Sequence, residues 1–240
     1  MISSGVNTRE LILEILLQIE EEGEHSHIAI RNALSKYQFL PKQERSFITR
    51  VCEGTLEYRI YIDYVIDSFS KVSVNKMKPQ IREILRSAVY QLKFMDSVPD
   101  SAVCNEAVKL AVKKNFGTLR GFVNGVLRNI ARNIDNIEYP DKSTNTDKYL
   151  SVKYSVPEEL AGYFLKKFGD NETEEMFEAF NKDKSTYIRC NTKKTDIAGL
   201  TAALEAEGVT VTNEGIDKRI DYALKISGYD YLGGLKSFRD

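Results

Sequence analysis

The sequence predicts a mainly helical protein, in which an all-helical bundle precedes a small helical and α/β segment. Two observations favour this fold class. Apolar side chains recur at helical spacing through the first 132 residues, where no alternating strand pattern occurs. Short runs typical of strands appear only after residue 184. With 240 residues, of which 42% are hydrophobic, the chain can bury the core of one large or two modest domains.

Four helices are expected before residue 70, and the first covers residues 7–22. Three glutamates at positions 20–22 lie at the C-terminal end of that helix, where the helix dipole disfavours negative charge. We therefore expect the helix to stop early. After a short second helix, Pro41 suits the first turn of a longer one. Gly54 within this longer helix permits the close approach of a neighbouring element.

The clearest helical pattern covers residues 76–95, where apolar residues recur at spacings of one and three. Its outer face is expected to carry Arg82 and Arg86. Two further amphipathic helices occupy residues 99–132, with apolar faces toward the core and basic residues toward solvent. We therefore interpret residues 1–133 as one compact domain of seven or so helices.

The second half of the chain begins with a polar stretch, residues 134–149, which is typical of a linker. Residues 150–240 then form a second region, which opens with two helices. Ser155 to Glu158 resembles a capping box, so the first of these helices should start there and bury Leu160. A small α/β unit follows. It is expected to contain a helix that Gly208 ends and three strands, at residues 186–190, 209–211 and 223–226.

The formal net charge of −1 conceals an uneven distribution of charge along the chain. Residues 71–132 contain 12 Lys and Arg but only 4 Asp and Glu. The flanking segments are acidic, with 7 basic and 11 acidic residues in 1–70 and 15 and 20 in 133–240. Such clustering indicates a surface that faces a polyanion. A basic face that is merely solvated is equally compatible with the charge alone.

Residue types with catalytic or metal-binding roles form no recognisable site in the sequence. Cys52, Cys104 and Cys190 are odd in number and widely spaced, which argues against disulfides and a metal site. His25 and His27 lack accompanying ligands. No glycine-rich nucleotide motif opens a helix, and no cysteine follows Pro or Thr as expected for a cytosine-methylating nucleophile. Without a signal peptide or a membrane-spanning apolar run, we expect a cytoplasmic protein.

Several segments of the chain resemble a known family. EGTLEYR at 53–59, NEAVKLAVK at 105–113 and GFVNGVLRNIAR at 121–132 resemble the NusB-like RNA-binding helical domain. Further along, YSVPE at 154–158 and IRCNTKK at 188–194 are similar to the connecting region of the bacterial 16S ribosomal-RNA cytosine-C5 methyltransferases. Both halves occur in the order found in that family, and the resemblance covers nearly the whole chain.

The resemblance implies an RNA-binding domain at 1–133 and a connecting region at 150–240, which precede a catalytic domain dependent on S-adenosylmethionine. That domain has no counterpart in the 240 residues, so we expect them to bind no cofactor and to be inactive alone. The implied partners are 16S ribosomal RNA and the protein's own C-terminal methyltransferase domain, with no membrane and no metal. The residues expected to touch RNA phosphates from one open flank are Arg82, Arg86, Lys109, Lys113, Lys114, Arg120, Arg128 and Arg132.

Arg189 is a further candidate contact, which could face RNA or dock the catalytic domain. Tyr187 could stack on a base, although a tyrosine in a strand more commonly packs in the core. Two other functions stay open. A NusB-type transcription antitermination factor would explain residues 1–133 but has no counterpart of residues 150–240. A protein-interaction scaffold would place the basic face against an acidic partner.

Overall fold

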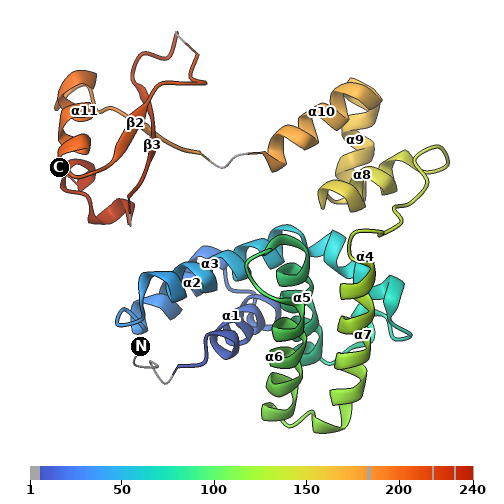
Figure 1. Cartoon of the computed structure of the whole chain (residues 1–240). Coiled ribbons are helices and arrows are strands. Elements are labelled where there is room, and N and C mark those ends of the chain that lie inside the picture. Colours follow the sequence, from blue (N-terminus) through green and yellow to red (C-terminus); the bar gives the residue numbers. More distant parts are fainter. Residues whose placement is uncertain (1–5, 183–184, 218, 230, 240) are drawn as a thin grey trace. The chain divides into compact units, whose positions relative to one another are not determined.

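The computed structural model describes the chain except for residues 1–5, 183–184, 218, 230 and 240. The chain forms two compact units, Met1–Glu178 and Ala179–Asp240. Figure 1 traces the first unit from blue to amber and the second in orange and red. The helices that begin within the first unit are α1 (Thr8–Glu22), α2 (Ser26–Lys36), α3 (Lys42–Glu57), α4 (Arg59–Phe69), α5 (Pro79–Phe94), α6 (Asp100–Lys113), α7 (Arg120–Asn133), α8 (Thr146–Tyr154), α9 (Glu158–Phe168) and α10 (Asp170–Asn181).

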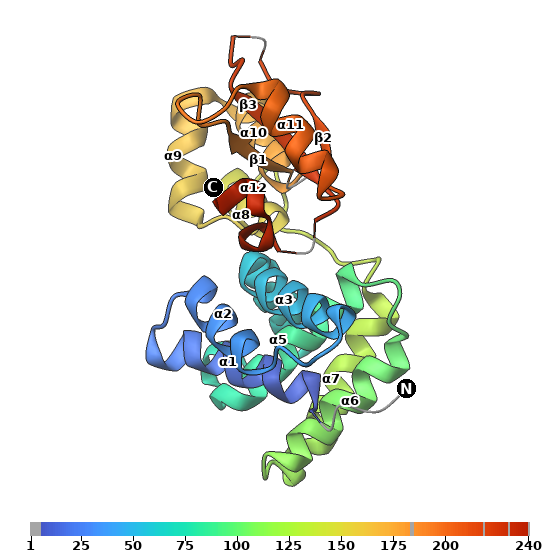
Figure 2. The ribbon, with the colours of Figure 1, turned by 90° about the vertical axis from the view of Figure 1, so that its left-hand side faces the viewer.

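The first seven helices form one bundle with α5 at its centre and α2 packed on α1 and α3, which confirms the predicted all-helical bundle. α5 contacts α1, α3, α4, α6 and α7. Its buried residues occupy every turn, because neighbouring helices cover it on nearly all sides. α6 and α7 pack against each other and lie side by side in Figures 1 and 2. A 3-10 turn at Gly117–Leu119 joins them, within the stretch 99–132 where the sequence predicts two helices.

α1 continues to Glu22, so the predicted early stop is wrong. Gly23 ends the helix in the left-handed region at φ 70°. The glutamates tolerate the negative end of the helix dipole because arginines from other helices compensate them. Glu20 pairs with Arg59 at 2.5 Å, and Glu21 pairs with Arg82 at 3.3 Å.

α8, α9 and α10 belong to the first unit, although the sequence groups residues 150–240 together. α8 starts inside the predicted linker and packs against α4. The predicted capping box is wrong: Ser155 ends α8 at φ 56°, and its Oγ accepts the Ile60 N–H at 3.1 Å. α9 starts after Pro157 without a side-chain cap, and Leu160 is 43% exposed rather than buried.

The second unit is the predicted small α/β unit. It contains α11 (Ile197–Ala206) and a three-stranded antiparallel sheet in the order β1-β3-β2. β1 pairs with β3 from Thr186 opposite Ile226 to Arg189 opposite Ala223. Leu204 of α11 and Cys190 lie in its core. The remaining elements are β1 (Thr186–Arg189), β2 (Thr210–Thr212), β3 (Ala223–Ser227), a 3-10 turn at Leu232–Gly234 and α12 (Lys236–Arg239).

Candidate nucleic-acid interface

α7 presents three arginines to solvent. Its apolar side chains are buried in the bundle, which turns Arg120, Arg128 and Arg132 outward. Within the described part of the chain, no carboxylate lies within ion-pair distance of these three guanidinium groups, and α7 itself contains no Asp or Glu. Arg128 Nε donates to Asn124 Oδ1 at 2.9 Å, which orients this guanidinium along the helix. Arg132 follows one turn later on the same side.

The lysines at the end of α6 lie against acidic residues of α1. Lys113 Nζ is 2.5 Å from Glu10 Oε2, and Lys114 Nζ bridges Glu10 at 2.8 Å and Glu14 at 3.2 Å. Hydrogen bonds from Lys113 and Lys114 lower the pKa of Glu10. These pairs are partly exposed, and exposed ion pairs of this kind are worth only about 0–1 kcal/mol. A phosphate could therefore compete for the two lysines, but it would have to displace a carboxylate.

The two arginines of α5 lie in a cluster of ion pairs, so the expectation that both project from an outer face is wrong. Arg86 is 5% exposed. Its Nε and Nη2 donate to the two carboxylate oxygens of Asp63, both at 2.7 Å, and its Nη1 donates to Glu83 at 2.8 Å. Arg82 contacts Glu83 and Glu21, each at 3.3 Å. Arg86 therefore holds α4 and α5 together and is inaccessible to a phosphate group.

Burial and charge act in opposite directions within this cluster. Burial raises the pKa of Glu83, although the neighbouring Arg86 favours its charged form. Burial alone would lower the pKa of Arg86, but Asp63 and Glu83 raise it above the ordinary value. The guanidinium group of Arg86 is therefore charged at every relevant pH and remains paired with these carboxylates.

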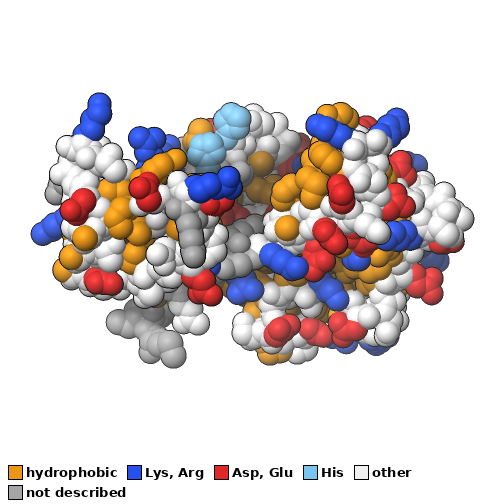
Figure 3. All heavy atoms as spheres, turned by 90° about the horizontal axis from the view of Figure 1, so that it is seen from above, with side chains coloured by type: hydrophobic (Ala, Val, Ile, Leu, Met, Phe, Trp, Pro, Cys, Tyr) orange, Lys and Arg blue, Asp and Glu red, His pale blue; other side chains and the backbone are white. Residues whose placement is uncertain are grey.

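The predicted basic residues thus do not share one open flank. The α7 arginines are exposed without a carboxylate partner, whereas Lys109 is exposed but pairs with Glu106 at 2.8 Å in its own helix. On the face drawn in Figure 3, blue basic side chains lie among red acidic ones, without one sign dominating. Among the predicted residues of the first unit, those of α7 form the clearest candidate for contact with a polyanion.

Arg189 lies in the second unit, on the exposed side of β1. Its guanidinium carbon is 5.8 Å from the centroid of the Tyr222 ring, within the range of a cation–π contact. Tyr187 is 54% exposed on the same strand, so the expectation of a core tyrosine is wrong. The sequence reasoning missed Tyr222. Tyr222 directly precedes the third predicted strand, which became β3 and pairs with the strand of Arg189. This position was the signal in the sequence that could have identified it.

The remaining reactive residue types of the described chain form no candidate metal site. Among the described residues, no group of three His, Cys, Asp or Glu could hold a metal ion, and no helix is long and apolar enough to cross a membrane. Cys52, Cys104 and Cys190 are buried, and burial raises the pKa of Cys52 and Cys104. The loop from β1 to α11 has the sequence CNTKKTD and no glycine. It is therefore unlike a loop that wraps a nucleotide cofactor.

Comparison with known proteins finds one matching family and relatives of two kinds, methyltransferases and NusB proteins. The model described as the NusB family matches residues 6–132. A probable ribosomal RNA small subunit methyltransferase B from Bacillus subtilis is 29% identical over 205 residues, which are 85% of this chain and 45% of the relative. A transcription antitermination protein NusB from Dictyoglomus thermophilum is 33% identical over 131 residues, which are 54% of this chain and 85% of that protein.

A solved structure shares the fold along almost the whole chain. The structure of the protein PH0851 superposes with a TM-score of 0.66 at 24% identity, covering 98% of this chain and 52% of that one. The chain therefore spans about half the length of both the methyltransferase relative and this structural relative.

Proposed function

Because this chain belongs to the NusB family, we propose that it is the RNA-binding portion of an enzyme that methylates ribosomal RNA of the small subunit. One observation supports this choice over an antitermination factor. The alignment with the methyltransferase relative extends over 205 residues, whereas the NusB protein aligns over only 131. The longer alignment must include part of the chain beyond the NusB match, which the factor leaves unexplained.

We propose that RNA lies along α7, with Arg120, Arg128 and Arg132 as its main phosphate contacts. These guanidinium groups are exposed and have no carboxylate to displace among the described residues. Lys109, Lys113 and Lys114 contribute less, because each already faces a glutamate. Contacts of this kind position an RNA without reading its sequence. The domain would thus recruit the substrate, and selection of the target base would occur elsewhere.

In this proposal the substrate is 16S ribosomal RNA and the modified atom is C5 of a cytosine. S-adenosylmethionine would supply the methyl group, bound by a methyltransferase domain that is the partner of this chain. The loop from β1 to α11 contains no glycine, and all three cysteines are buried. We therefore expect the 240 residues alone to transfer no methyl group.

The salt dependence of RNA binding tests the α7 interface. The 240-residue chain is titrated with a hairpin from 16S ribosomal RNA at several salt concentrations. The double variant Arg128→Ala/Arg132→Ala should bind more weakly, and the slope of log affinity against log salt should fall in magnitude by about 1.4, which is about 0.7 per lost contact on single-stranded regions.

The matched control is the double variant Lys113→Ala/Lys114→Ala, which removes the same charge at the C-terminal end of α6. Its slope should change less, because Glu10 and Glu14 already neutralise these lysines. Equal slopes for wild type and the α7 variant would overturn the interface. An equal loss in both double variants would show that net charge, and not α7, determines binding.

A further inference from the structure

One face of the sheet in the second unit packs against the core of that unit, and the other face is open to solvent. Along β1, Tyr187 and Arg189 are exposed, whereas the intervening Ile188 packs against the core. On β3, Leu224 and Ile226 are buried on the core side. The alternation of side chains along a strand therefore places Tyr187 and Arg189 together on the open face.

The partner strand extends this open face. Tyr187 is paired in register with Lys225 of β3, and neighbouring residues across strands lie on the same face. At the end of β1, the Cys190 N–H donates to the Tyr222 carbonyl at 2.8 Å. This bond fixes Tyr222 beside Arg189, where its ring, 44% exposed, meets the guanidinium. The open side of β1 thus carries the exposed ring of Tyr187 and, two residues on, Arg189 with the ring of Tyr222 against its guanidinium.

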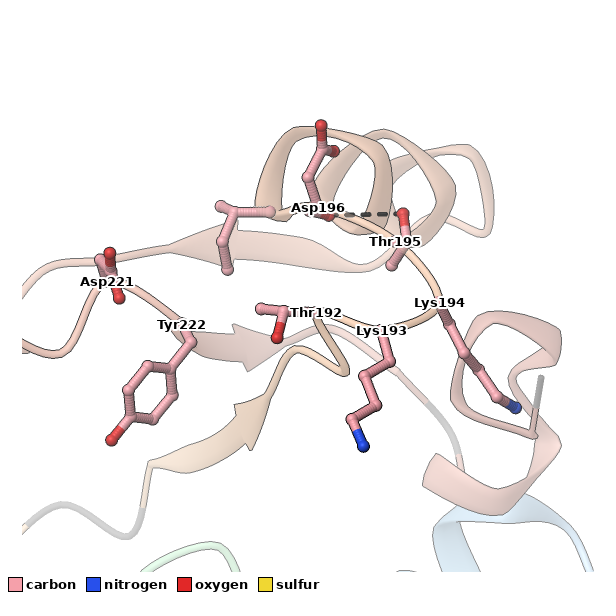
Figure 4. Close-up of a pocket in the computed structure, with 8 residues that line it drawn as sticks. Thr192, Lys193, Lys194, Thr195, Asp196, Asp221 and Tyr222 are labelled. Atoms are coloured by element: carbon pink, nitrogen blue, oxygen red, sulfur yellow. Dashed lines mark hydrogen bonds between the residues drawn. The ribbon is translucent and has the colours of Figure 1, made fainter.

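A hollow of about 380 Å³ continues from Tyr222 along the loop that follows β1. Figure 4 shows Tyr222 and Lys193 extending to the same side of this loop, with Thr192 between them. Asp221 and Lys194 lie at opposite ends of the hollow in this view. Its volume falls in the range of sites that hold small organic groups, about 300–1,000 Å³. The lysine end suits a phosphate group, and the tyrosine wall suits a planar ring.

We propose that this strip, formed by Tyr187, Arg189, Tyr222 and Lys193, binds single-stranded RNA. Unpaired bases stack on aromatic rings and guanidinium planes, and cations beside the rings attract the phosphates between them. In the strip, Tyr187 provides an open ring, the Arg189–Tyr222 pair a second planar surface, and Lys193 the adjacent positive charge. Two carboxylates line the hollow: Asp196 caps α11 through the Gly199 N–H at 2.7 Å, and Asp221 lies at the end of the hollow away from Lys194.

The strip requires a different form of RNA from the α7 interface. Base stacking needs bases that are free of a duplex, whereas phosphates are available on any RNA. The strip therefore adds a preference for unpaired nucleotides, and its existence is independent of the α7 arginines. A protein surface would be the other occupant of such a face, and the experiment below separates the two.

Binding of a fluorescent single-stranded RNA of mixed sequence to the 240-residue chain, followed by anisotropy, tests the strip. Tyr187→Ala should weaken binding about five- to tenfold, the lower range for one lost base stack. Tyr187→Phe keeps the ring and should bind like wild type. Tyr163→Ala removes an equally exposed tyrosine from α9 and should also bind like wild type. None of these variants should change the affinity for a blunt duplex of the same sequence.

Crosslinking of the same RNA carrying 4-thiouridine gives an independent readout, and crosslinks are expected in the peptides that contain Tyr187 or Tyr222. Unchanged binding of Tyr187→Ala, or an equal loss in Tyr187→Phe, would overturn the strip. Crosslinks confined to α7 would also overturn the strip and would favour a protein surface as the occupant of this face. Because Arg128→Ala/Arg132→Ala should weaken single strands and duplexes alike, failure of the strip and failure of the α7 interface give different results.

Discussion

Gly54 lies in α3 at the point where the ring of Tyr90 from α5 covers the helix backbone. A Cβ atom at this position would overlap the ring of Tyr90. That ring cannot withdraw easily, because it packs against Phe94 and Tyr58 with centroids 5.2 and 6.4 Å away. The sequence indicated a close approach at this glycine. Which ring makes the approach depends on how α3 and α5 pack, and no local pattern contains that information.

Gly54→Ala should lower the free energy of unfolding by about 1–3 kcal/mol, the usual cost of overpacking a core. Urea denaturation followed by circular dichroism measures the change. The control is Gly125→Ala in α7, where a Cβ would meet nothing within 4 Å. There, higher helix propensity should raise stability by up to about 1 kcal/mol. A Gly54→Ala protein as stable as wild type would contradict the packing described for Tyr90.

Glu174 of α10 controls a pH-dependent contact in the same unit. Hydrogen bonds from Lys142 and Lys153 lower its pKa to about 2, from an ordinary value of 4.5. A carboxylate with a lowered pKa in the folded state stabilises that state above its unfolded pKa, and the contribution disappears as the pH falls through the folded pKa. The contact should therefore act fully above about pH 4.5 and be lost between about pH 4.5 and pH 2.

The melting temperature of wild type and of Glu174→Gln, measured from neutral pH down to about pH 2, tests this contact. Wild type should melt at the higher temperature near neutrality, and the difference should shrink as the pH falls below about 4.5. Glu175→Gln, one residue along the same helix, controls for the loss of a surface charge. A difference that is constant with pH would show that Glu174 stabilises the unit by packing alone.

At the scale of elements, α5 shows that hydrophobic periodicity predicts where a helix lies but not which of its polar residues are exposed. Its apolar stripe identified the helix, and local patterns also predicted the close approach at Gly54 and the two helices that are α6 and α7. Pro41 lies one residue before α3, as its N-cap, rather than in the first turn. The stripe of α5 also predicted an outer face with Arg82 and Arg86, but Arg86 is buried. Its carboxylate partner Asp63 comes from another helix, 23 residues earlier. Whether a polar residue on a helix is exposed or buried depends on such distant partners. The sequence analysis therefore predicted more exposed basic residues on this flank than the structure contains.

Arg86→Met should lower the free energy of unfolding by about 3–5 kcal/mol, because it leaves Asp63 and the buried Glu83 without their main partner. Lys93→Met is the control on the same helix. It removes a partly exposed pair with Asp135 at 3.6 Å and should cost about 1 kcal/mol or less. Adding Glu83→Leu to Arg86→Met should recover part of the loss. Equal effects of the two single variants in urea denaturation would contradict the buried cluster.

Ser155 shows the same limit at a helix end. A serine three residues before a glutamate fits a capping box, but the helix it belongs to is the preceding one. Its hydroxyl oxygen accepts a hydrogen bond from the N–H of Ile60 in α4, 95 residues earlier in the chain. On α7, by contrast, the apolar face packs against α4, α5 and α6, and all three arginines are exposed as the helical period predicts. The helical period therefore predicts exposure correctly on α7, where no carboxylate from another described helix pairs with the arginines.

At the scale of the whole molecule, the chain has separate cores rather than one. The bundle core contains Leu127 and α5, whereas the core of the second unit contains Leu204, and the two clusters share no residue. The second unit has 62 residues, a size at which folding buries a smaller share of the surface than in larger domains. The two proposed RNA surfaces thus rest on cores that can lose stability separately.

Leu204→Ala and Leu127→Ala form a matched pair that tests this separation. Each removes a fully buried leucine, and each should lower the stability of its own unit by about 2–5 kcal/mol. Hydrogen exchange read by mass spectrometry should show faster exchange in β1, β3 and α11 for Leu204→Ala, with α5 unchanged. Leu127→Ala should speed exchange in the bundle and spare the sheet. Faster exchange in both units from either substitution would mean that the two cores unfold as one, and the independence of the two RNA surfaces would then be lost with it.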